Sequence, residues 1–127
     1  MNIAFLIGRI IVGGYFISAG VNHFRNLNYM SEFAKSKGTP APKAAVAGTG
    51  ILLLLGGLSM LLGVSPHIGI ILLIIFLLGV SVQIHAFWKV SDPQTRTMEM
   101  INFMKNMALI GALLMFLAIP IPWPLSW

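Results

Sequence analysis

A single arginine lies inside a long apolar stretch near the start of the chain. A charged side chain within a membrane helix costs about 2.5–3.5 kcal/mol on insertion scales, so Arg9 marks a place where the helix packs or binds something. At 3.6 residues per turn, Arg9 shares one helix face with Gly13, Phe16, Gly20 and His23. Glycines allow another helix to approach closely, so we expect this face to be packed. In the alternative reading, the long side chain of Arg9 reaches the nearer headgroups.

Arg9 has no acidic residue close to it in the sequence. The acids Glu32, Asp92 and Glu99 all fall in polar gaps that lie at the other end of the apolar stretches. The remaining partners for Arg9 are the C-terminal carboxylate, a lipid phosphate, a bound anion or another subunit.

Two histidines end apolar stretches at what should be one membrane depth. His23 and His85 could bind a metal or haem iron if they faced each other. Histidine and tryptophan are also ordinary at membrane boundaries, and Trp88 follows His85 closely. We therefore expect no metal and no haem, and we treat both histidines as residues that contact a ligand or a partner.

Other polar side chains near the membrane boundary are ligand or partner candidates. Gln83 lies about 200° round a helix from His85, so we expect it to face a different neighbour, and to make a helix contact together with Gly79. The full set of candidates is Arg9, His23, Gln83, His85, Asn102, Lys105 and Asn106.

The asparagines Asn102 and Asn106 are spaced four residues apart, with Lys105 beside them. They could bond across helices, hold an anion or simply form a polar helix entry. No arrangement of residues points to a catalytic group. The glycines expected to pack helices together are Gly13, Gly20, Gly56, Gly57 and Gly79.

Four apolar stretches must position these residues. The chain has 127 residues, of which 57% are hydrophobic and only 9% charged, so lipid must solvate it. About 20 helical residues cross a bilayer core, and the stretches at residues 3–24, 44–64, 68–88 and 103–120 are about that long. Backbone groups facing lipid must be satisfied within each segment, so the spans are helical. We predict an all-α integral membrane protein: one domain over residues 1–127, forming a four-helix bundle.

The gaps between the spans carry the charges. The first gap should form a short amphipathic helix on the membrane surface, ended by Gly38 and by Pro40 and Pro42. The first and third gaps hold nearly all the lysines and arginines, which predicts that they face the cytoplasm and that both termini lie outside. The net charge of +5 therefore serves membrane orientation, and we expect no nucleic acid as a partner. The absence of cysteine excludes disulfides and thiolate metal sites within this chain.

The order of several short motifs resembles the DoxX family of small four-span membrane proteins. The matching segments are Gly8-Arg9-Ile10, Ala19 to Phe24, Lys37 to Pro42, Gly56-Gly57, His85 to Trp88, and Phe103 to Gly111. Family members commonly carry an acid before the glycine pair, where this chain has only apolar residues, and often a lysine at position 23. The resemblance implies a multi-pass protein of a bacterial or archaeal cell membrane, associated with redox complexes.

Three functions remain open at this point. The first is a non-catalytic subunit of a larger membrane complex of the redox or respiratory type, contributing helix packing and a surface that faces lipid or quinone. The second is a quinone- or lipid-binding oxidoreductase subunit, with Arg9, His23, Gln83 and Asn106 around one cavity. The third is a small oligomeric transporter. We expect no turnover by the isolated chain and no resident cofactor other than a bound quinone or lipid. The expected partners are lipids, other membrane subunits or further copies of the chain.

Overall fold

The computed structural model describes residues 2–126 and contains four long apolar helices. They are α1 (Asn2–Arg25), α3 (Pro42–Leu62), α4 (Pro66–Gln83) and α5 (Pro93–Phe116). A short helix α2 (Leu27–Ser36) follows α1, and a 3₁₀ turn η1 (Phe87–Lys89) precedes α5. Each long helix is apolar enough to cross a membrane. The predicted all-α membrane fold is confirmed.

Proline and capping residues set where the helices begin. Pro42, Pro66 and Pro93 each occupy the first turn of a helix, where a missing N–H costs no hydrogen bond. Asp92 caps α5, because its carboxylate accepts a hydrogen bond from the Thr95 amide at 2.9 Å. Together with the Thr95 hydroxyl, that amide lowers the pKa of Asp92.

Glycines bring α1 and α3 into backbone contact. A Cβ atom at Gly13 would lie 2.9 Å from the carbonyl oxygen of Gly57, and one at Gly57 would lie 2.9 Å from that of Gly13. Gly20 is packed in the same way against Leu54 and the Gly50 carbonyl. The buried residues of α1 are the five that the sequence places on one face: Arg9, Gly13, Phe16, Gly20 and His23.

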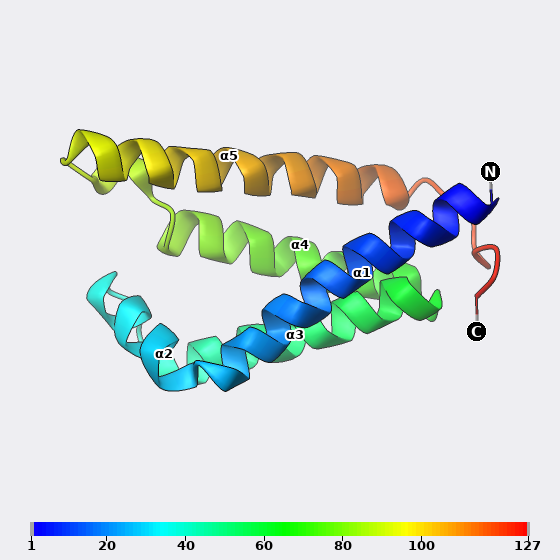
Figure 1. Ribbon diagram of the computed structural model, residues 1–127, viewed down its shortest axis with the longest axis horizontal. Helices are drawn as coiled ribbons and strands as arrows, with labels where there is room; N and C mark the ends of the chain where they lie inside the picture. The colour runs from blue at the N-terminus through cyan, green and yellow to red at the C-terminus, as the bar shows by residue number, and fades with distance from the viewer. Residues whose placement is uncertain (1, 127) are drawn as a thin grey trace.

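The helices form a row rather than a closed ring. α3 packs on α1 and α4, and α5 packs on α4 (Figure 1). Within residues 2–126, no Cα atom of α1 lies within 8 Å of one in α5. One end of the bundle holds the start of α1, the α3–α4 turn and the C-terminal tail, which is residues 117–126 after α5. α2 and the α4–α5 connection lie at the other end (Figure 1).

The third and fourth helices differ in extent from the apolar stretches. α4 ends at Gln83, whereas the apolar sequence continues to Trp88, because Phe87, Trp88 and Phe103 instead form a cluster of edge-to-face rings. α5 begins ten residues before the fourth apolar stretch, at Pro93, where Asp92 caps it. Hydropathy alone does not distinguish a helix from an apolar turn, so the end of α4 could not be read from it. The start of α5 follows instead from the turn signal Asp92-Pro93, with Asp92 as the cap.

Candidate functional site

The buried face of α1 carries a polar residue near each end of the bundle. Arg9 lies at the end with the tail, and it is only 2% exposed. His23 lies at the opposite end, near α2, and it is 8% exposed. The two side chains have very different surroundings.

Arg9 is surrounded by backbone carbonyl oxygens. Its Nε donates to Met60 at 3.1 Å and its Nη2 to Leu61 at 3.0 Å, both in the last turn of α3. Its remaining hydrogen bonds reach the tail, where Nη1 donates to Pro124 and Nη2 donates to Leu125 at 3.3 Å. The last carbonyls of a helix lack intrahelical partners and carry partial negative charge, so they suit a guanidinium.

Aromatic rings complete the surroundings of Arg9. The guanidinium carbon lies 5.6 Å from the ring centre of Phe5 and 5.7 Å from that of Trp123, within cation–π range. Trp123 is 2% exposed and folds the tail back against the bundle. The small cavity beside Arg9, of about 230 Å³, is lined almost wholly by apolar side chains.

The partners of Arg9 therefore differ from those expected from sequence. Carbonyls of its own chain, rather than an anion or another subunit, accept hydrogen bonds from all three guanidinium nitrogens. These carbonyls lie more than fifty residues away in sequence, so no local pattern indicates them. The C-terminal carboxylate belongs to Trp127, which is outside the described residues.

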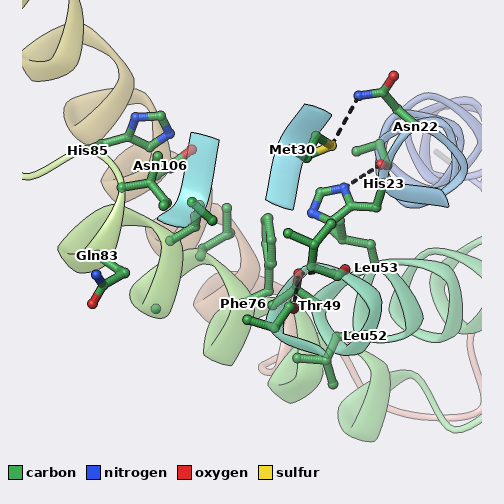
Figure 2. A pocket seen from close by; sticks show the side chains of 18 of the residues that line it. Asn22, His23, Met30, Thr49, Leu52, Leu53, Phe76, Gln83, His85 and Asn106 are labelled. Carbon is green, nitrogen blue, oxygen red and sulfur yellow. Dashed lines mark hydrogen bonds between the residues drawn. The ribbon is translucent and has the colours of Figure 1, made fainter. Parts of the chain in front are cut away.

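A much larger cavity, of about 890 Å³, occupies the opposite half of the bundle. Residues from α1, α2, α3, α4 and α5 all contribute to its walls. Figure 2 shows His23 and Thr49 on the α1–α3 side and His85 and Asn106 on the α4–α5 side. Apolar side chains such as Leu53 and Phe76 form much of the lining between them.

Four of the candidate residues share this cavity with His23. Gln83, His85, Lys105 and Asn106 also line it. Gln83 and His85 both line the cavity, but their polar contacts go to different neighbours, the Lys37 carbonyl oxygen for Gln83 and the Glu99 carboxylate for His85. Arg9 does not line this cavity, so the grouping of Arg9 with His23, Gln83 and Asn106 is wrong.

Two candidates have other surroundings. Asn102 is half-buried on α5 but does not line the cavity. Gly79 lines the cavity, and a Cβ there would meet no atom within 4 Å, so the expected close helix contact is not made. Gly56 does lie in such a contact, since a Cβ there would be 3.0 Å from the Gly69 carbonyl oxygen.

A polar cluster joins three segments beside the cavity. The Glu99 carboxylate on α5 lies 3.2 Å from Nδ1 of His85 and 3.9 Å from Nζ of Lys37. The amide of Gln83 donates to the Lys37 carbonyl oxygen at 3.1 Å. Lys37 directly follows α2, so these contacts connect the end of α2 to α5 and to the end of α4. Within residues 2–126, no Cα atom of α2 lies within 8 Å of one in α4 or α5.

Sequence reasoning missed Glu99 as a member of the site. Glu99, Phe103 and Asn106 recur at the spacing of one helix face, which is the signal that could have found it. Within residues 2–126, no group of three or more His, Cys, Asp or Glu side chains could hold a metal ion.

Comparison with known families assigns the chain. The DoxX family model matches residues 4–86, which is more than half of the sequence. The chain belongs to the DoxX family. The matched part of this DoxX protein contains α1 to α4 with Arg9, His23, Gln83 and His85, whereas Glu99 and Asn106 on α5 lie beyond it. No curated protein and no solved structure matches the chain.

Proposed function

We propose that this DoxX protein is a small membrane subunit that holds one lipid-soluble ligand, a quinone or a lipid, in the cavity beside His23. The subunit has no turnover of its own and serves a larger membrane complex of the redox type. The observation that carries the proposal is the cavity of about 890 Å³ with mainly apolar walls and a few buried polar groups.

The size and lining of the cavity support a lipid-soluble ligand. Sites for small molecules typically have volumes of about 300–1,000 Å³, with apolar walls and a small number of placed polar groups. The cavity is within this range, and His23 and Asn106 are its buried polar residues. The separation of α1 from α5 supports entry from the bilayer, because no close backbone contact within residues 2–126 joins these two helices.

The redox-type complex is supported by the DoxX family rather than by the bundle. The resemblance to the DoxX family implies association with redox complexes, and the family match covers residues 4–86 of this chain. Arg9 does not argue for a second subunit, because carbonyl oxygens of its own chain accept its hydrogen bonds. The main structural support for the proposal is therefore the large cavity beside His23.

The transporter alternative has less support. No residue lines both the large cavity and the small cavity beside Arg9. Phe16, Leu53 and Met60 are almost fully buried in the packed core of the bundle. A transport path through a single copy would have to open this core.

Blocking the cavity tests the proposal. Phenylalanine at Gly79 should fill part of the cavity without a clash, because nothing lies within 4 Å of a Cβ there. Gly111→Phe is the matched control, since Gly111 is equally open but does not line the cavity. Native mass spectrometry after mild extraction should detect a bound amphiphile on the wild-type protein and on Gly111→Phe, and much less on Gly79→Phe. Equal retention by all three proteins would contradict the proposal.

The orientation of the subunit is a separate part of the proposal. The basic residues of the first and third gaps favour an orientation with those gaps in the cytoplasm and both termini outside. Single cysteines introduced at Lys37 and Ser126 should be labelled from opposite sides of sealed vesicles. Labelling of both from one side would overturn this orientation.

A further inference from the structure

One ring nitrogen of His23 is already committed to the protein. Nδ1 of His23 lies 2.8 Å from the carbonyl oxygen of Ala19, one turn earlier on α1. A carbonyl oxygen can only accept, so Nδ1 must carry the proton in this contact. The other nitrogen of a neutral imidazole is then a hydrogen-bond acceptor, so the backbone of α1 fixes Nε2 as an acceptor.

The ring of His23 projects from α1 into the large cavity. Figure 2 shows it on the cavity side of the helix, and the residue is 8% exposed. The ring of Phe76 lies edge-to-face with it, at 5.9 Å between ring centres. Among the described residues, no hydrogen bond to Nε2 accompanies the bond at Nδ1. Nε2 is open to the cavity rather than sealed within the protein, so a ligand in the cavity can reach it.

A second unpaired polar group lies across the cavity. Asn106 on α5 is 4% exposed and lines the same space from the opposite side (Figure 2). Within the part of the chain that the structure describes, its side-chain amide makes no hydrogen bond, and the amide atoms are open to the cavity. An amide both donates and accepts, so it can bind either end of a polar head.

We infer that the cavity selects an amphiphile whose polar head donates a hydroxyl hydrogen bond to Nε2 of His23, with Asn106 binding the same head from the opposite wall. This inference rests on the proposed function and deepens it by naming the chemistry of the ligand. A head that only accepts hydrogen bonds leaves Nε2 unpaired. Phenolic and quinol heads, and the free hydroxyl of a glycerolipid, all have the required donor.

Lys105 offers a competing type of recognition. It also lines the cavity and would favour a ligand with an anionic head. Lys105 is exposed, however, whereas His23 and Asn106 are more than nine-tenths buried. Buried unpaired groups discriminate more strongly than an exposed charge, which solvent and salt screen.

Matched synthetic ligands test the inference in lipid nanodiscs. 4-Dodecylphenol and 4-dodecylanisole share one tail and one ring and differ in a single methyl group, which removes the hydroxyl donor. Native mass spectrometry measures the bound fraction of each at equal total concentration. The wild-type protein should bind the phenol about tenfold more tightly, as expected for one net hydrogen bond in a buried site. Monoacylglycerol, added as a third ligand, shows whether a glycerol hydroxyl or a phenolic hydroxyl is bound more tightly.

Variants connect the preference to its residues. His23→Phe should bring the phenol-to-anisole ratio close to one while the tail still binds. Asn106→Leu should weaken binding of the phenol, and Asn102→Leu is its control, because Asn102 is on the same helix but outside the cavity. In protein labelled with ¹⁵N-histidine, the Nε2 resonance that His23→Phe removes should shift with the phenol and not with the anisole.

The failures of the inference and of the proposed function are distinguishable. Equal binding of phenol and anisole to the wild-type protein would overturn the inference and leave a cavity that binds any lipid-soluble tail. Stronger binding of 4-dodecylbenzoate than of the phenol, lost in Lys105→Leu, would assign recognition to the anionic type and overturn it as well. No binding of any of these ligands would contradict the proposed function itself.

Discussion

Arg9 and His23, the two polar side chains on the buried face of α1, have opposite surroundings. At one end, Arg9 donates hydrogen bonds to four carbonyls, from Met60 and Leu61 in α3 and from Pro124 and Leu125 in the tail. At the other end, His23 has one bond to its own helix, and Asn106 has no partner among residues 2–126.

This difference separates a structural group from a binding group. Arg9 has the costlier charge, and a charge in a membrane span suggests function by default. Arg9 nevertheless donates its hydrogen bonds to carbonyl oxygens of α3 and of the tail, and so it links the tail to the end of α3. The neutral His23 and Asn106 keep unused hydrogen-bonding capacity beside a cavity of about 890 Å³. Nε1 of Trp123 at the Arg9 end also has no partner among the described residues, but the cavity beside it is only about 230 Å³. Free hydrogen-bonding groups beside a cavity large enough for a ligand are a better sign of a binding site than charge alone.

The largest effect on stability is expected at Arg9. Arg9→Leu removes the donors and leaves buried carbonyls of α3 and of the tail without partners. We expect a loss of about 3 kcal/mol in the free energy of unfolding, the size typical of hydrogen bonds to a charged group. Denaturation in detergent micelles measures it. Arg9→Lys keeps the charge without the planar fork, so it should restore only part of the loss. Unchanged stability of Arg9→Leu would mean that the arginine only reaches toward headgroups.

A smaller loss is expected where α1 meets α3. Gly57→Ala places a Cβ at 2.9 Å from the Gly13 carbonyl oxygen, so the two backbones must move apart. Overpacking of this kind costs about 1–3 kcal/mol. Gly14→Ala is the control on the same pair of helices, because a Cβ at Gly14 meets nothing within 4 Å. If thermal melting temperatures of the two variants are equal, the close contact between α1 and α3 is wrong.

The polar cluster beside the cavity should contribute less. Glu99→Gln removes the ion pair with Lys37, whose nitrogen lies 3.9 Å away and is partly exposed. Such a pair contributes about 0–1 kcal/mol. We expect faster amide hydrogen exchange in residues 37–39, because the end of α2 loses a contact with α5. Glu32→Gln, at an exposed position on α2, should leave that exchange unchanged.

The smallest effect on stability is expected at Asn106, which sharpens the contrast with Arg9. Asn106→Leu replaces an unpaired buried amide with an apolar side chain of similar size. Removing a polar group that makes no hydrogen bond within the protein is close to neutral, so the ligand-free protein should unfold at the same temperature or slightly higher. A clear loss of stability would show that the amide has a structural partner, as Arg9 does, and would contradict its assignment as a ligand-binding group.

Features that depend on helical periodicity and hydropathy can be predicted from the sequence. The face of α1 from Arg9 to His23 follows from the helical repeat and from glycines at Gly13 and Gly20, and these residues are the ones that the structure buries. The four-helix fold follows from hydropathy and helix length. Helix α2 follows from the amphipathic first gap and the Gly38 that ends it.

Long-range geometry accounts for the errors. The carbonyls around Arg9 come from the end of α3 and from the tail, and a sequence does not show which helix end meets which side chain. α4 ends at Gln83, inside an apolar run that hydropathy reads as one helix as far as Trp88. Gly79 faces a cavity rather than a neighbouring helix, and composition does not separate these two uses of glycine.

Photochemical labelling tests the central claim, that the His23 end binds an amphiphile and the Arg9 end does not. A dodecylphenol with a diazirine beside its ring is equilibrated with the protein in nanodiscs, irradiated, and mapped by peptide mass spectrometry. We expect labelling concentrated on cavity residues such as Leu53, Phe76 and Asn106, and competed by unlabelled dodecylphenol. Labelling spread without competition over lipid-facing residues, such as Ile11 and Ile71, would contradict the account.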